Sequence, residues 1–466
     1  MERRGGQYLN RRRYLLSGTP SSGKTTRHPV ADVASALREN SFLRISLSAK
    51  DKSKQFNNLL CHFTVENFRA AFRSLDGSKA VGIDGIKKKE YEQNLEINLR
   101  DLVTRIHKGT YRPNPKREVL IPKANGKTRP IAIATFEDKL VEWVTREILN
   151  ALYEPIFADH SYGFRPRRNA YQAIKHFYCG LKDNKRPHVV EIDFSSFFNT
   201  VPHRPLIKML EKRITDPRFM SLISRLLEAE IEKSTGQTVS STIGTPQGSI
   251  ASPVLANIYL HYVIDEWFRE RYHPKGAVAV RYADDVVYSF KTEAEAKEFA
   301  TAFQKRVQNY QLVINEEKSK TIDFQPRNGN IFNFVGFTFY WSIDRGSNKR
   351  RLRVKTSKST LYKKVNEYDA WIKENRNKVR LQELWDTTKA KLRGHYNYYG
   401  LGSNRPKLVH FYHEVTRSLF RWINRRSQRK SMTWEKFHRR LISDPLPIPP
   451  PVMALKHLID RRIYVN

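Results

Sequence analysis

The sequence predicts an α+β protein, in which a mixed core of strands and helices precedes a basic helical region. Short apolar runs bounded by glycine, proline or acidic residues occur through the middle of the chain, which is typical of buried strands. Longer segments with apolar residues at helical spacing lie between them. From about residue 355 onward the pattern is helical and rich in Lys and Arg. These observations favour a strand and helix core followed by a helical module.

The composition indicates a folded protein with a polyanionic partner. The chain has 466 residues, of which 39% are hydrophobic and 12% aromatic, enough for two or three domains with substantial cores. Lys and Arg number 84 against 47 Asp and Glu, which gives a formal net charge of +37. Without an acidic partner, so large a charge would only cause self-repulsion. We therefore expect the protein to bind nucleic acid.

The cysteine content and the apolar runs bear on location. Cys61 and Cys179 are far apart and form no C-x-x-C pair, so a disulfide framework or a cysteine-rich zinc site is not expected. The longest apolar run, IFNFVGFTFYW, is too short to span a bilayer, and the Arg-rich start lacks the apolar segment of a signal peptide. We expect a soluble, cytoplasmic protein without a membrane partner.

The elements of the core follow from local patterns. Apolar runs on either side of Asn125 and Gly126 predict a β-hairpin, because both residues tolerate positive φ. The segment LVEWVTREILNALYEPIF predicts a helix. Its buried face is expected to contain Leu140, Val144, Ile148 and Leu152.

Later segments predict the rest of the core. HVVEIDFSSFF is interpreted as a short buried strand that ends at Asp193. GTPQGSIASPVLANIYLHYVIDEWF predicts a glycine-rich loop and then a helix, with Ser252 as its N-cap and Pro253 in its first turn. GAVAVRYADDVVYSF predicts two apolar strands hinged on acids, and AEAKEFATAFQKRVQNY an amphipathic helix.

Near the start, the stretch GTPSSGKT (residues 18–25) fits the phosphate-binding pattern G-x-x-x-x-G-K-[ST]. A working phosphate loop needs a buried strand before it and a helix that begins at once after it. Here only RRRYLLS precedes it, and TTRHP places a proline where the helix should start. We interpret residues 1–55 as a basic, flexible extension that contains a chance match.

The stretch YADD carries the main chemical signal. Two adjacent carboxylates at a tight turn repel each other, and a bound divalent cation would offset that cost. With Asp193 at the end of another strand, Asp284 and Asp285 would hold two Mg²⁺ ions about 4 Å apart. One ion would help to deprotonate a 3′-hydroxyl, and the other would neutralise a leaving pyrophosphate. For the Asp-Asp pair alone, an exposed turn is the alternative interpretation.

At this point the chain resembles a known family. YADD looks like the signature of reverse transcriptases, and EIDFSSFF looks like the strand that carries their other catalytic aspartate. GSKAVGIDGI, IPKANGKTRPIAIAT, SYGFRPRRNAYQAI, GTPQGSIASPVLANIYL, NEEKSK and FNFVGFTF follow in the order seen in group II intron reverse transcriptases, also called maturases. The resemblance covers roughly residues 60–445.

The resemblance implies a right-hand polymerase with fingers, palm and thumb. Residues 1–55 would form the basic extension, 56–345 the fingers and palm, 346–425 the helical thumb or maturase region, and 426–466 a short region that looks like a DNA-binding segment. No endonuclease motif follows, so mobilisation of an intron would use a pre-existing primer or single-stranded DNA. The implied catalytic and metal-binding residues are Asp193, Asp284 and Asp285, with two Mg²⁺ ions as cofactor.

The resemblance also implies which residues contact the incoming nucleotide. Phe198 matches the aromatic gate that meets the incoming sugar, with the neighbouring Phe197 as its competitor. Cations near the hairpin turn suit triphosphate oxygens, although Lys127 is also compatible with a solvated turn. The implied nucleotide-binding set is Lys123, Lys127, Arg129, Phe197, Phe198 and Gln247.

Further matches imply contacts with nucleic acid. SYGFRPRRNA resembles the segment near template and nucleotide, and NFVGFTF the segment that grips the primer, although its phenylalanines also fit a plain buried strand. KLRGHYNYYG alternates cations with tyrosines, which suits phosphate contact and base stacking, but a helix with a tyrosine core face gives the same pattern. The implied set is Tyr162, Phe164, Arg165, Gly336, Lys391, Arg393, His395 and Tyr396.

Three functions fit these features. The first is an RNA-directed DNA polymerase that also binds its parent group II intron RNA, assists splicing and takes part in retrohoming, with RNA template, DNA primer or target and dNTPs as partners. The second is a non-catalytic RNA-binding splicing factor, although such a protein has no need for all three aspartates. The third is a free-standing enzyme adopted for host DNA repair or defence. The oligomeric state is left open.

Overall fold

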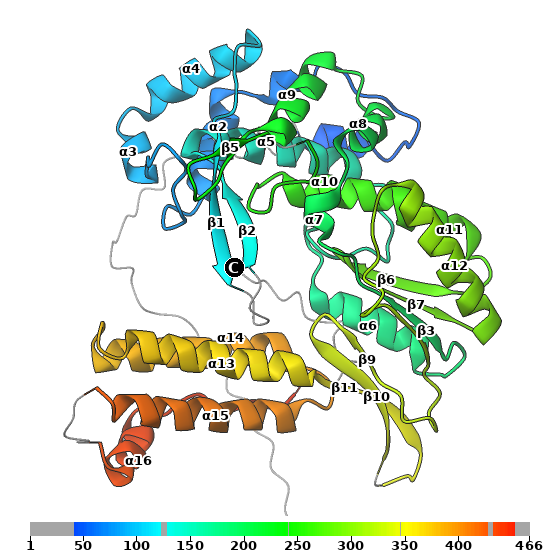
Figure 1. Cartoon of the computed structure of the whole chain (residues 1–466), viewed down its shortest axis with the longest axis vertical. Coiled ribbons are helices and arrows are strands. Elements are labelled where there is room, and N and C mark those ends of the chain that lie inside the picture. The colour runs from blue at the N-terminus through cyan, green and yellow to red at the C-terminus, as the bar shows by residue number, and fades with distance from the viewer. Residues whose placement is uncertain (1–41, 123–127, 241, 345, 427–431, 453–466) are drawn as a thin grey trace, which may run out of the picture.

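The computed structural model describes residues 42–122, 128–240, 242–344, 346–426 and 432–452. The stretch at residues 18–25 and the hairpin turn at Asn125 and Gly126 lie outside these ranges. Within the described ranges, no helix is both long and apolar enough to cross a membrane. The chain contains helices and mainly antiparallel sheets (Figure 1), so the predicted α+β class is confirmed.

The first part of the fold consists of helices packed around a four-stranded sheet of order β2-β1-β4-β5. β1 and β2 pair antiparallel from Arg117↔Ile133 to Pro122↔Thr128, which confirms the predicted hairpin, here called the fingers hairpin. The predicted helix face is also confirmed, because all four of its residues are fully buried. The elements are η1 (Leu59–His62), α2 (Val65–Ser74), α3 (Lys88–Glu92), α4 (Leu95–His107), β1 (Lys116–Pro122), β2 (Thr128–Ile133), α5 (Phe136–Tyr153), α8 (His203–Glu211), α9 (Pro217–Glu228), β4 (Ile231–Glu232) and β5 (Thr238–Val239).

The second part is an antiparallel sheet of order β6-β7-β3-β8, here called the palm sheet. It separates two hydrophobic cores: Val190 and Ile192 face one, and Val189 and Val287 face the other. Both faces are therefore covered, and the apolar residues of β3 contribute to both cores. The elements are α6 (Ala170–Leu181), β3 (His188–Ile192), α7 (Phe197–Thr200), α10 (Ser252–Leu260), the π-helix η2 (His261–Asp265), α11 (Glu266–Arg271), β6 (Val278–Tyr282), β7 (Asp285–Phe290), α12 (Glu293–Asn309) and β8 (Lys320–Asp323).

The third part is a small sheet followed by helices. The sheet has the order β11-β10-β9, and α13, α14 and α15, here called the thumb helices, form a layer toward which the fingers hairpin points in Figure 1. The helices begin only at Lys358, because residues 350–356 still pair with β10; the predicted boundary at residue 346 therefore cuts a hairpin. The elements are β9 (Phe332–Phe334), β10 (Phe337–Ile343), β11 (Arg350–Thr356), α13 (Lys358–Asn375), α14 (Leu381–Tyr399), α15 (Arg405–Ile423) and α16 (Trp434–Ser443).

Two further predictions need correction. Part of the predicted extension is packed: residues 42–48 are helical, and Ile45 and Ala49 are buried in the core. Arg213 holds this segment by donating to the carbonyls of Ala49 and Asp51. Ser252 is not an N-cap, because it is the first residue of α10 and its hydroxyl donates to the carbonyl of Pro246 at 2.9 Å, which closes the preceding loop.

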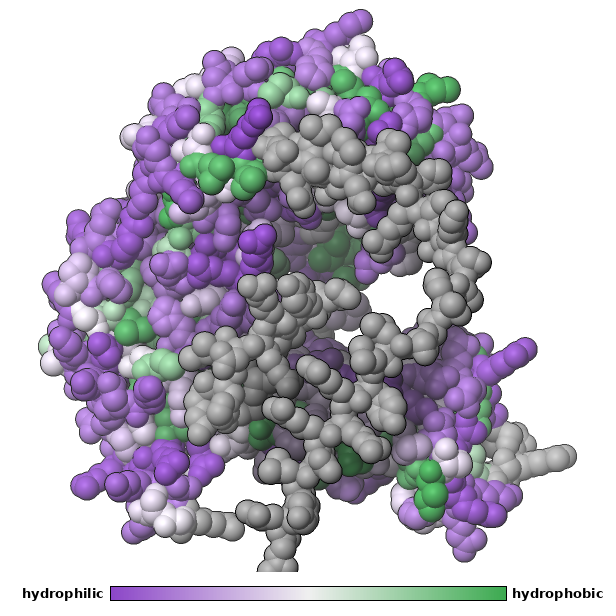
Figure 2. Space-filling view, turned by 180° about the vertical axis from the view of Figure 1, so that it is seen from behind, coloured by the Kyte–Doolittle hydropathy of each residue, from purple (hydrophilic) through white to green (hydrophobic). Residues whose placement is uncertain are grey.

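The surface agrees with the composition. Figure 2, a view from behind, shows a mostly hydrophilic face on which hydrophobic residues form small, separate patches. Charged residues make up 28% of the chain, with a formal net charge of +37. A chain with this excess of positive charge is suited to bind a phosphate backbone.

Candidate active site

The palm sheet brings Asp193 and Asp285 to the same edge. β3 ends at Ile192, which pairs with Val286 of β7. The next position along the two antiparallel strands therefore places Asp193 beside Asp285. The backbone of Asp193 is held by its neighbours, because its N–H donates to Ser319 Oγ at 3.1 Å and its carbonyl accepts from the N–H of Asn315 at 2.8 Å.

Asp284 lies in the turn between β6 and β7. Tyr282 pairs directly with Asp285, so only Ala283 and Asp284 form the turn, which we call the catalytic turn. Ala283 has a φ of +58°, a left-handed conformation that costs a residue with a Cβ roughly 1–2 kcal/mol. The surrounding structure must therefore hold this turn in place.

Burial and neighbouring carboxylates raise the pKa of Asp284 and Asp285. The protein packed around Asp285 excludes water and, with help from the charges of Asp284, Glu191 and Asp193, raises the pKa of Asp285 to about 7. The Val335 N–H opposes this shift by donating to Asp285 Oδ2 at 2.9 Å. Burial and Asp193 also raise the pKa of Asp284. Crowded carboxylates of this kind are stabilised by a divalent cation.

Asp193 forms an ion pair with Lys318, a residue that was not among the predicted site residues. Lys318 Nζ lies 3.1 Å from Asp193 Oδ2, and both side chains are exposed to solvent. Lys318 belongs to the NEEKSK motif, which was the available signal for its presence at the site. Among the described residues, no three His, Cys, Asp or Glu side chains already form a group that could hold a metal ion. The oxygen-only donors fit Mg²⁺, and Lys318 contacts only Oδ2 of Asp193.

The SYGF segment packs against the backbone of the catalytic turn. A Cβ added to Gly163 would lie 2.2 Å from the backbone nitrogen of Ala283, so only glycine permits this approach. Tyr162 and Arg165, predicted to contact nucleic acid, are instead buried. Tyr162 Oη is hydrogen-bonded to His176 Nδ1 at 2.9 Å, and Arg165 forms an ion pair with Glu154. Arg165 also donates to the carbonyls of Ala158 and Ser161, so both side chains make contacts within the protein, which corrects their predicted role.

The aromatic residues after Asp193 separate into two environments. Phe197 is buried in the core, which is not compatible with its predicted contact to a nucleotide. Phe198 is only partly buried and meets Phe164 edge to face, with ring centroids 6.1 Å apart. Phe164 itself is 53% exposed. Phe198 therefore stays the predicted sugar gate, and Phe164 stays a predicted nucleic-acid contact.

Other predicted nucleotide contacts lie around the fingers hairpin. Arg129 is exposed on β2, and its positive charge partly opposes the rise in the pKa of Asp284. Arg129 therefore lies within electrostatic reach of the catalytic turn. Gln247 and Phe198 line one cavity of about 200 Å³, and the Gln247 carbonyl accepts from the N–H of Ala132 at 2.7 Å. Lys123 and Lys127 lie outside the described residues.

The predicted primer-gripping segment contacts Asp285, one of the candidate catalytic residues. Val335 and Gly336 have positive φ values of +49° and +78°, and the N–H of Val335 donates to Asp285. A Cβ at Gly336 would lie 3.3 Å from Tyr399 Oη of α14. Phe334, Phe337 and Phe339 are all buried, so their alternative interpretation as core residues is confirmed.

The predicted RNA-binding segment of α14 divides between surface and core. Lys391 and Arg393 are exposed, and Lys391 Nζ lies 4.7 Å from the ring centroid of Trp371. His395 and Tyr396 are buried. His395 stacks on Phe411 with centroids 3.7 Å apart, and burial lowers its pKa to about 3. An uncharged, packed imidazole does not contact phosphates as a cation, which corrects the prediction for His395 and Tyr396.

Comparison with known proteins identifies this arrangement. The reverse transcriptase (RNA-dependent DNA polymerase) family matches residues 121–339. The chain is 33% identical over 296 residues to Protein YkfC of Escherichia coli, covering 56% of this chain and 76% of that protein. It is 36% identical over 198 residues to the group II intron-encoded protein LtrA of Lactococcus lactis, covering 42% of this chain and 32% of LtrA.

A third relative is a 91 kDa protein in the cob intron of Schizosaccharomyces pombe, which is 32% identical over 234 residues, covering 49% of this chain and 28% of that protein. The chain thus spans about three quarters of YkfC but a third or less of the two intron proteins. With the aspartates at the edge of the palm sheet, these matches show that the chain belongs to the reverse transcriptase family of RNA-directed DNA polymerases, in the group that includes group II intron-encoded proteins.

Proposed function

We propose that the chain extends a DNA primer on an RNA template from dNTPs, with two Mg²⁺ ions held by Asp193, Asp284 and Asp285. The observation that carries this proposal is the placement of Asp193 beside Asp285 at one edge of the palm sheet, with Asp284 in the adjoining turn. Burial, with a smaller contribution from the neighbouring carboxylates, raises the pKa of Asp285 to about 7. When bound, the metal supplies activation of the 3′-hydroxyl and charge neutralisation at the leaving pyrophosphate.

The chain's own residues bind and orient the reactants. Arg129 offers a planar fork of donors to the triphosphate, together with the predicted contacts Lys123 and Lys127. Phe198 faces the sugar and selects against a 2′-hydroxyl, and Gln247 contacts the nucleotide from the loop after β5. Gly336 brings the backbone close to the primer end, because it carries no side chain there.

We further propose that the protein binds its parent group II intron RNA, assists splicing and acts in retrohoming. Lys391 and Arg393 are exposed on α14, and the net charge of +37 favours a long phosphate backbone. Structured RNA is recognised mainly through its shape and backbone, so one basic surface can serve both roles. The isolated cysteines Cys61 and Cys179 suit a reducing, cytoplasmic location.

One set of proteins tests these proposals in two assays. DNA synthesis is measured on a primed RNA template, and splicing on a group II intron precursor RNA at low Mg²⁺. Asp284→Asn is expected to abolish synthesis and spare RNA binding and splicing, whereas Lys391→Ala with Arg393→Ala weakens RNA binding and splicing. RNA binding through phosphate contacts should also weaken steeply with salt, and a flat salt response would contradict this mode of binding.

Each other outcome has a defined meaning. DNA synthesis without any effect on splicing would contradict the maturase proposal and favour a free-standing enzyme. Splicing assistance without DNA synthesis would contradict the polymerase proposal and favour a non-catalytic splicing factor.

A further inference from the structure

A buried arginine lies directly behind the catalytic turn. Arg281 is fully buried at the end of β6. Its Nη1 donates to the Ala283 carbonyl at 2.9 Å and to Asn257 Oδ1 at 2.8 Å. Its Nε and Nη2 donate to both carboxylate oxygens of Asp265, with distances of 2.9 Å to Oδ1 and 2.5 Å to Oδ2. One guanidinium thus joins the turn to the long helix beneath it.

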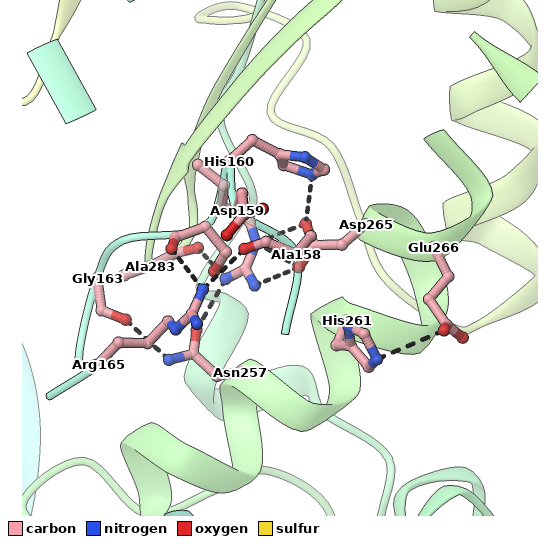
Figure 3. Close-up of polar contacts among 12 residues, drawn as sticks. Ala158, Asp159, His160, Gly163, Arg165, Asn257, His261, Asp265, Glu266 and Ala283 are labelled. Carbon is pink, nitrogen blue, oxygen red and sulfur yellow. Dashed lines mark hydrogen bonds and ion pairs between the residues drawn. The ribbon is translucent and has the colours of Figure 1, made fainter. Parts of the chain in front are cut away.

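The same helix also holds the segment on the other side of the turn. Asn257 Nδ2 donates to the Gly163 carbonyl at 2.8 Å, and Gly163 packs against the backbone nitrogen of Ala283. Ala283 is therefore fixed through its carbonyl by Arg281 and at its nitrogen by Gly163. In Figure 3, Asn257 extends from the helix toward Gly163, and Asp265 is directed toward His160.

A π-turn in the helix makes this arrangement possible. Asn257 belongs to α10, and Asp265 ends the π-helix η2, which continues into α11. Over eight residues of regular α-helix, at 3.6 residues per turn, Asp265 would lie about 80° around the helix axis from Asn257. The wider π-turn rotates the chain less per residue and returns Asp265 to the face of Asn257. Such turns are frequent at functional sites.

Burial of the charged side chains of Arg281 and Asp265 costs free energy. The side chains of Arg281 and Asp265 are 0% and 2% exposed, and burial of an ion pair often brings no net stability over apolar residues of similar size. Burial alone would raise the pKa of Asp265, but the charge of Arg281 and hydrogen bonds from Arg281 and His160 lower it well below its usual value. His160 Nε2 also lies 3.4 Å from Asp265 Oδ1. A contribution to folding stability does not by itself explain why these charges are buried, whereas a role in positioning the catalytic turn does.

We propose that Arg281, Asp265 and Asn257 form a positioning clamp, which fixes the catalytic turn in the conformation that lets Asp284 and Asp285 bind metal together. None of the three residues touches the reacting atoms; they act through the backbone of Ala283 and Gly163. The proposal rests on the polymerase function proposed above.

The test removes both charges of the pair at once. Arg281→Met with Asp265→Leu leaves no unpaired buried charge, so a loss of folding is not expected. With a primed RNA template, we expect unchanged template affinity, a kcat about 100-fold lower, as for a roughly 1 Å displacement of catalytic groups, and a higher Mg²⁺ concentration for half-maximal rate. A folded double variant with unchanged kcat and unchanged Mg²⁺ dependence would overturn the clamp.

A conservative pair of variants covers the case in which the double variant does not fold. Arg281→Lys keeps the charge beside Asp265 but lacks the fork that reaches Ala283 and Asn257 together, so kcat should fall and the Mg²⁺ requirement should rise. Arg213→Lys is the matched control, because Arg213 is equally buried and donates to Ala49 and Asp51 instead. Equal kinetics in both variants would overturn the proposal, whereas absence of DNA synthesis by the unaltered protein would contradict the polymerase function itself.

Discussion

Replacement of Gly163 by alanine is expected to displace the catalytic turn. The added Cβ would lie 2.2 Å from the backbone nitrogen of Ala283 and 2.9 Å from its Cα, and reaching 3.0 Å requires the two segments to separate by about 0.8 Å. A displacement near 1 Å costs on the order of 100-fold in rate, and overpacking of this kind costs about 1–3 kcal/mol of stability. We therefore expect Gly163→Ala to incorporate dNTPs about 100-fold more slowly, since Asp284 moves with the turn.

The assay is single-turnover incorporation of one dNTP on a primed RNA template, with thermal unfolding measured on the same preparations. Gly346→Ala is the control, because a Cβ there meets no atom within 4 Å, and its effect should stay within about 0.5 kcal/mol. If Gly163→Ala folds and incorporates dNTPs at the unaltered rate, the contact between Gly163 and Ala283 does not hold the turn, and the reasoning is refuted.

Three further predictions follow from buried or half-buried side chains. Lys116 lies 2.9 Å from Glu142, with side chains 1% and 0% exposed, so Lys116→Met should lower the free energy of unfolding, measured in urea, by about 3–5 kcal/mol. The control Arg69→Met, at an exposed ion pair, should lower it by at most about 1 kcal/mol. Equal losses of stability in the two variants would contradict this argument. Burial lowers the pKa of His395 from 6.5 to about 3, so as the pH falls the imidazole is protonated in the unfolded chain before it is protonated in the folded protein. The stability present above pH 6.5 therefore falls by about 2 kcal/mol at pH 5. A His395→Phe variant with the same pH dependence of unfolding would exclude this residue as the cause. Phe198→Ala should admit ribonucleotides, measured as the ratio of kcat/KM for dNTP and rNTP, and an unchanged ratio would rule out the gate.

Periodicity and local motifs were sufficient for the elements of the core. The fingers hairpin and the buried face of α5 were predictable because each depends on residues close together in the sequence. The placement of Asp193, Asp284 and Asp285 at or beside strand ends was predictable for a similar reason, since the local pattern defines those ends. The resemblance then supplied what local patterns do not contain, namely that the two strands are neighbours in one sheet.

Burial against distant segments was not predictable from the same patterns. The alternation of cations and tyrosines in α14 does not reveal that His395 stacks on Phe411 of another helix. Arg165 reads as a surface cation until Glu154 is placed beside it. The π-turn that aligns Asn257 with Asp265 leaves no periodic signature in five residues, so the support of the catalytic turn required the structure.

The central claim is that the carboxylates at the edge of the palm sheet catalyse DNA synthesis on RNA. The most direct measurement is primer extension on an RNA template with Mg²⁺, comparing the unaltered protein with Asp285→Asn at equal RNA binding. We predict long DNA products from the unaltered protein and none from the variant. Equal products from both proteins, or none from either while RNA binding stays tight, would contradict the account.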